Sequence, residues 1–83
     1  MKPVEEMNAM EVCAYLVAKS SKGLLGKDEL VRLYDLHCAK FKAELNAGGT
    51  KAVSEDFKRE LLTETVEEAR TKEESASAGE TGR

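Results

Sequence analysis

Histidine and cysteine are the side chains from which a small chain could build a nucleophile or a metal site. This 83-residue sequence holds one histidine, His37, and two cysteines, Cys13 and Cys38. A catalytic thiol needs a base within hydrogen-bonding reach. His37 and Cys38 are adjacent, and adjacent side chains on a helix diverge by about 100°. We therefore predict no catalytic residues and interpret His37 as a histidine at the edge of the core.

A metal site is equally unfavoured by the spacing of these residues. Structural zinc takes four ligands, usually in closely spaced pairs, and Cys13, His37 and Cys38 supply neither the number nor the spacing. Two cysteines are also far fewer than small disulfide-stapled secreted domains carry. We predict two buried, reduced thiols, and neither a metal nor a cofactor.

One loop partially resembles a calcium-binding motif. Residues 18–29 can be aligned with the twelve-residue EF-hand loop, with Gly23 at the turn and Glu29 at the final acidic position. Lys22, however, falls where an oxygen ligand is required, and its charge opposes a divalent cation. We predict no calcium site, and the sequence leaves open whether this degenerate loop has any role.

The elements that would position these residues are helical, because apolar residues recur every three or four positions and no segment alternates as a strand does. The spacing predicts helices over residues 9–21, 27–45 and 54–71. Asn8 with Glu11 is typical of a capping box, and Ser54 is a favourable N-cap. We predict an all-α fold, a small three-helix bundle over residues 1–71 with a short N-terminal leader.

Each predicted helix has one apolar face that we expect to point inward. The faces comprise Ala9, Val12, Cys13, Leu16, Val17 and Ser20 in the first helix; Leu30, Leu33, Tyr34, His37, Phe41 and Leu45 in the second; and Phe57, Leu61, Leu62, Val66 and Ala69 in the third. Ala14 and Ala18 lie on the other side of the first helix, where a second neighbour could approach. The first helix is therefore predicted to be central. Residues 72–83 contain no bulky apolar side chain, which predicts a disordered acidic tail.

Composition excludes the larger classes of protein. With 83 residues, of which 41% are hydrophobic and 35% charged, the chain is too small for a multidomain enzyme. It has neither an apolar run long enough to cross a membrane nor the features of a secretory signal. We expect a cytoplasmic protein that does not contact membranes.

Two surfaces are candidates for partner binding. Arg32, Leu36, Ala39 and Ala43 stack along the second helix opposite its predicted inner face, which favours self-association or a partner helix, although one exposed leucine and two alanines are also ordinary surface composition. The net charge is −3, and the acidity is concentrated in the last 30 residues. An acidic surface of Glu60, Glu64, Glu67 and Glu68 is predicted there, either as a solvated face or as a docking site for a basic partner.

These observations favour a non-enzymatic function. We expect a small protein–protein interaction module, an adaptor or inhibitor, that binds a larger protein or a second copy of itself through a helical face. The size would also suit an accessory protein of a bacteriophage or mobile element. The alternative is a dimeric helix-turn-helix-like DNA-binding regulator. Nucleic acid is the less favoured partner, because Asp28 and Glu29 open the second helix, Glu55 and Asp56 open the third, and carboxylates there repel phosphate.

Overall fold

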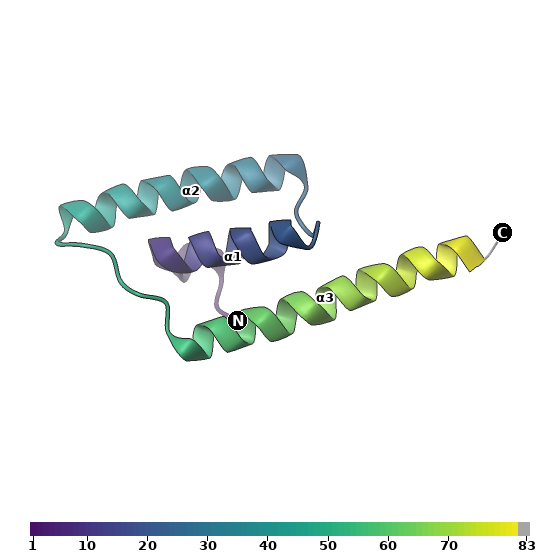
Figure 1. Ribbon diagram of the computed structural model, residues 1–83. Coiled ribbons are helices and arrows are strands. Elements are labelled where there is room, and N and C mark those ends of the chain that lie inside the picture. The colour runs from purple at the N-terminus through teal and green to yellow at the C-terminus, as the bar shows by residue number, and fades with distance from the viewer. Residues whose placement is uncertain (82–83) are drawn as a thin grey trace.

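The fold is all-helical, as predicted. The computed structural model describes the backbone of residues 1–81 and the side chains of residues 1–74. A short 3-10 turn, η1 (Val4–Glu6), is followed by three helices, α1 (Ala9–Ser21), α2 (Lys27–Asn46) and α3 (Glu55–Thr81) (Figure 1). The described residues contain no strand, and none of their helices is both long and apolar enough to cross a bilayer.

Local sequence accounts for where the helices begin and end. The predicted capping box is present, because the Asn8 side chain accepts from the Glu11 amide and the Glu11 carboxylate accepts from the Asn8 amide, both at 2.9 Å. Gly23 ends α1 with a φ of 67°, in the left-handed region that glycine tolerates best. The Ser54 hydroxyl accepts from the Phe57 amide at 3.1 Å and so caps α3.

The central position predicted for the first helix is confirmed. Helix α1 packs against both α2 and α3, which lie on either side of it (Figure 1), and no comparable packing joins α2 to α3 within the described residues. The molecule measures 56 × 27 × 17 Å. Its smallest dimension leaves room for one layer of helices and the leader, so the three helices form a layer rather than a closed bundle.

The hydrophobic core is small and lies between the leader, α1 and α3. Its buried members are Met7, Val12, Phe57 and Leu61. Half-buried residues surround this cluster, including the two alanines on the second side of α1, and they are Val4, Ala14, Tyr15, Ala18 and Val53. Ala14 and Ala18 therefore pack against the molecule's own core rather than facing solvent.

Several predicted inward positions are wrong. On α2, Tyr34, Phe41 and Leu45 are exposed, with relative accessibilities of 58%, 38% and 53%. Other exposed residues that the sequence places inside are Val17 and Ser20 on α1, Cys38 on α2, and Leu62 and Val66 on α3. Helix α2 is rotated about its axis relative to the prediction. Leu33 is buried, Glu44 binds the backbone amide at the start of α1, and Lys40 binds backbone carbonyl oxygens of the leader.

The third helix is longer than its pattern predicts. It continues to Thr81, ten residues beyond the predicted end at residue 71. The added turns contain lysine, glutamate and alanine, which are strong helix formers, and extending an existing helix adds one hydrogen bond per residue fixed. The mobility predicted for residues 72–83 stays a prediction, and residues 82–83 lie outside the described part of the chain.

Candidate functional site

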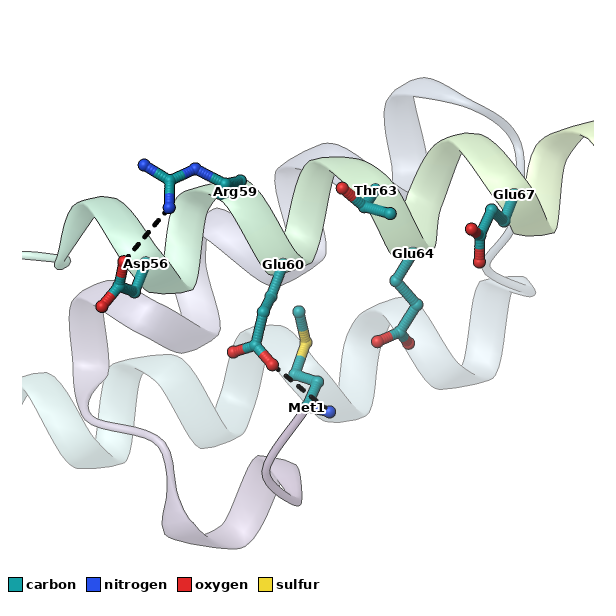
Figure 2. A pocket seen from close by; sticks show the side chains of 7 residues that line it. All are labelled: Met1, Asp56, Arg59, Glu60, Thr63, Glu64 and Glu67. Atoms are coloured by element: carbon teal, nitrogen blue, oxygen red, sulfur yellow. Dashed lines mark hydrogen bonds and ion pairs between the residues drawn. The ribbon is translucent and has the colours of Figure 1, made fainter.

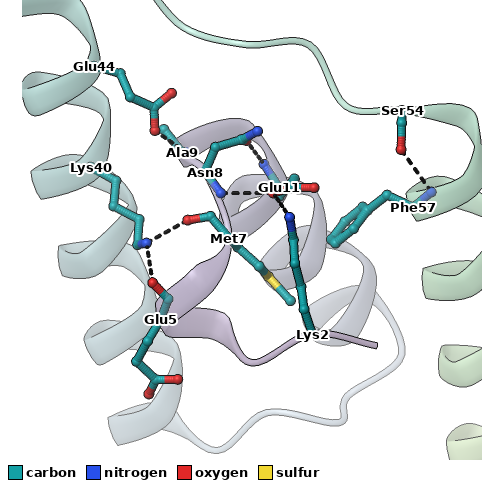
Figure 3. A network of polar contacts seen from close by, with 10 residues as sticks. All are labelled: Lys2, Glu5, Met7, Asn8, Ala9, Glu11, Lys40, Glu44, Ser54 and Phe57. Carbon is teal, nitrogen blue, oxygen red and sulfur yellow. Dashed lines mark hydrogen bonds and ion pairs between the residues drawn. The ribbon is translucent and has the colours of Figure 1, made fainter. Parts of the chain in front are cut away.

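The leader, residues 1–7, covers one side of the helical layer. Lys2 Nζ lies 2.9 Å from a Glu11 carboxylate oxygen, and Lys40 Nζ donates to the carbonyl oxygens of Glu5 and Met7 (Figure 3). Val4 packs at the edge of the core. The leader is therefore attached to both α1 and α2 through polar contacts.

The start of α1 is bound to α2 by two further hydrogen bonds. The Glu44 carboxylate accepts from the Ala9 amide at 2.6 Å (Figure 3), and His37 Nδ1 lies 2.9 Å from the Ala9 carbonyl oxygen. His37 is half-buried, as predicted for a core-edge histidine. Its Nδ1 contacts a backbone group. Within residues 1–74, no three side chains of the metal-binding types cluster as a metal site requires.

The four predicted partner-binding residues on α2 share one side of the helix, and this is the side that faces the leader. Arg32, Ala39 and Ala43 are exposed, and Arg32 Nη2 lies 4.0 Å from Glu29. Leu36 is only half-exposed, and it lines a cavity of about 310 Å³ together with Val4 of the leader and Tyr15 of α1. The apolar centre of this predicted surface is thus partly covered by the chain itself.

The four predicted acidic residues on α3 divide between two environments. Glu60, Glu64 and Glu67 line an open pocket of about 690 Å³, with the Met1 amino group 4.0 Å from Glu60 (Figure 2). Glu68 does not line this pocket, and it binds Lys19. The acidic surface is therefore partly used within the fold.

Lys19 forms an ionic clasp between α1 and α3, a feature that the sequence pattern did not identify. Its ammonium binds Glu68 and lies 3.4 Å from Glu64, while its side chain is 3% exposed. It also lies 5.4 Å from the centre of the Tyr15 ring. Burial opposes the charged form, but the hydrogen bond to Glu68 and the charges of both glutamates outweigh it and raise the pKa of Lys19.

The opposite side of the layer is apolar and open. Glu11 and Tyr15 face the leader, and the residues two positions further on α1, Cys13 and Val17, point about 200° away. On α2, Arg32 is on the leader side, so Tyr34, two positions further, points away from the leader. On α3, the pocket residues Glu60 and Glu64 are on the leader side, so Leu62 and Val66 point away from it.

We call this side the open face. Its exposed apolar members, drawn from all three helices, are Val17, Tyr34, Phe41, Leu45, Leu62 and Val66. Met10 and Cys13 are half-buried on α1 between the two outer helices. Exposed apolar residues that gather on one side of a protein mark interaction sites, whereas isolated exposed apolar residues do not.

The ionic contacts of the leader predict loss of stability in acid. Burial alone would raise the pKa of Glu11, but the hydrogen bond from the Asn8 amide and the adjacent Lys2 hold it below its ordinary value of 4.5. A carboxyl with a lowered folded pKa stabilises the fold above the unfolded pKa, and the contribution is lost as the pH falls through the folded value. We expect the melting temperature to fall below about pH 4.5. Glu11→Gln should melt lower at pH 7 and lose less on acidification, and an unchanged acid slope in this variant would contradict the assignment.

Comparison of the chain with known proteins gave no match to a family model, to a curated protein or to a solved structure. The open face and the Lys19 clasp are therefore identified from geometry and chemistry alone.

Proposed function

We propose that this chain is a small non-enzymatic protein–protein interaction module that docks a protein partner through the open face. One observation carries the proposal: most of the large exposed apolar side chains of α1, α2 and α3 lie, by their helical positions, on the side of the layer away from the leader. Such a surface is typical of helical docking, in which apolar anchors recur at helical spacing. The action expected is that of an adaptor or an inhibitor.

Arrangement of the charges supports a protein as the partner. The open face of α1 carries Met10, Cys13 and Val17 without a charged residue among them. Acidic residues occupy the first turns of both α2 and α3, where a DNA-reading helix would need donors. The DNA-binding alternative therefore gains no supporting observation. Two free thiols, one of them exposed, support a reducing compartment such as the cytoplasm.

Site-specific photo-crosslinking tests this function directly. A photoreactive amino acid placed at Tyr34 should capture a protein partner in cells that express the chain, because this position lies on the open face. The same amino acid at Ala39 serves as the matched control, since Ala39 is exposed on the other side of the same helix. The mass of the product separates a second copy from a larger partner.

Two results would decide the matter. A discrete product from Tyr34, abolished when Leu62 is replaced by glutamate, supports docking through the open face. Products of equal yield from Tyr34 and Ala39, or no product from Tyr34, would overturn it.

A further inference from the structure

We infer that the occupant of the open face is a second copy of this chain, so that two helical layers pack face to face with the leaders outside. The inference rests on the proposed function and names the partner of the same surface. A two-fold axis is the commonest symmetry of soluble oligomers, and it requires one self-complementary surface. The open face meets this requirement because all three helices contribute apolar residues to it.

The surface area of the single chain is larger than a compact monomer of its mass should have. A 9.1 kDa monomer is expected to expose about 4,900 Å², whereas this chain exposes 5880 Å². Its radius of gyration is 15.2 Å, against about 12 Å for a compact chain of this length. Part of the excess belongs to the end of α3 that projects beyond α1 (Figure 1). A standard interface removes about 800 Å² from each partner, which is of the same order as the whole excess, the part at the end of α3 included.

The small size of the core also favours a second copy of the chain as the partner. Among residues 1–74, Met7, Val12, Phe57 and Leu61 form the buried cluster, and a core of this size supplies little stability to a chain of this length. Packing two open faces together would bury the aromatic and aliphatic side chains of α2 and α3 that the single chain leaves in water.

Charge is compatible with a partner of identical sequence. The acidic pocket residues Glu60, Glu64 and Glu67 lie on the leader side of α3, so they would not meet their copies across the interface. By helical position, Lys42 lies at the edge of the open face on α2, and Glu73 lies at its edge on α3. A two-fold arrangement that places α2 of one copy over α3 of the other brings opposite charges together.

The experiment is a mass measurement on the full chain and three variants. Light scattering coupled to size-exclusion chromatography should give twice 9.1 kDa for the unmodified chain. Tyr34→Glu combined with Leu62→Glu should give the single-chain mass, with the dimer dissociation constant raised about 100-fold. Matched controls are Ala39→Glu and Thr63→Glu, which introduce the same charge at exposed positions on the leader side of the same helices. Each control should remain dimeric.

Circular dichroism of each variant distinguishes loss of association from loss of folding. Should the double glutamate variant unfold, Tyr34→Gln with Leu62→Gln replaces it and should also be monomeric. A monomeric unmodified chain at about 1 mM, a concentration that would populate even a weak dimer, would overturn self-association. So would a dimer insensitive to the Tyr34 and Leu62 changes, or one broken only by Ala39→Glu. Capture of a larger partner by Tyr34 in a monomeric chain would leave the proposed function standing, whereas absence of any product would remove both.

Discussion

Replacing Phe57 by alanine is expected to release α3 from the rest of the molecule. Phe57 is 5% exposed and belongs to the four-residue core cluster through which α3 packs on α1. Truncating a buried phenylalanine costs about 3 to 5 kcal/mol in the free energy of unfolding, because transfer energy and packing are both lost. That is a large part of the stability of a domain this small.

The Phe57→Ala variant should begin to unfold in α3, before the rest of the molecule. Helix α3 contains 27 residues, and an isolated helix is marginal in water without tertiary packing. Urea titration followed by circular dichroism should therefore show lost helicity before the main transition. Leu62→Ala is the matched control, since Leu62 is 65% exposed on the same helix. In the single chain it should change stability by no more than about 0.5 kcal/mol. Equal losses in the two variants, measured where the chain is monomeric, would contradict this account of the core.

The helices themselves are predictable because their signals are local. Asn8 and Ser54 act on amides within three residues, and Gly23 sits at the turn that ends α1. These contacts form whatever the rest of the chain does. The end of α3 is the exception, because helix propagation there depends on the packed turns before it rather than on an apolar pattern.

Rotation of each helix about its axis is not predictable in this way. An apolar stripe is assumed to face inward, yet α2 turns Lys40 toward the leader and Glu44 toward the start of α1, and leaves Tyr34 and Phe41 in water. The reason is non-local: the leader and the start of α1 have free backbone groups that only long polar side chains from another element can reach. In the same way, Lys19 is buried because its stem crosses the core edge and its ammonium meets two glutamates 45 and 49 residues away.

The disagreement between the most apolar side of α2 and its buried side supports the proposed docking function. A sequence under selection only for a monomeric fold gains nothing from Tyr34, Phe41 and Leu45 in water, and exposed apolar surface promotes non-specific association. Local rules tend to fail at functional surfaces. Sequence reasoning did not single out the open face as a candidate site, because its residues fit the pattern of a buried core.

The Lys19 clasp should respond very differently to changes at its two ends. Removing the glutamates with Glu64→Gln and Glu68→Gln together leaves an ammonium whose side chain is 3% exposed without a charged partner. Leaving a buried charge without its partner lowers the free energy of unfolding by about 3 to 5 kcal/mol. We expect about 3 kcal/mol here, because the two glutamate positions are half-exposed and admit water. Lys19→Met, in contrast, keeps the buried stem and frees two glutamates that water can solvate, so it should change stability by no more than about 1 kcal/mol.

Chemical denaturation of these variants at neutral pH measures the asymmetry, with Glu60→Gln as the control because Glu60 lies on α3 outside the clasp. Combining Lys19→Met with the two glutamine changes should restore most of the lost stability, because the buried position then holds no charge in need of a partner. Equal losses from both ends would mean that the ion pair itself holds α3 against α1. The expected asymmetry would instead mean that apolar packing by Phe57 and Leu61 holds the helix, and that the glutamates serve mainly to make a buried lysine tolerable.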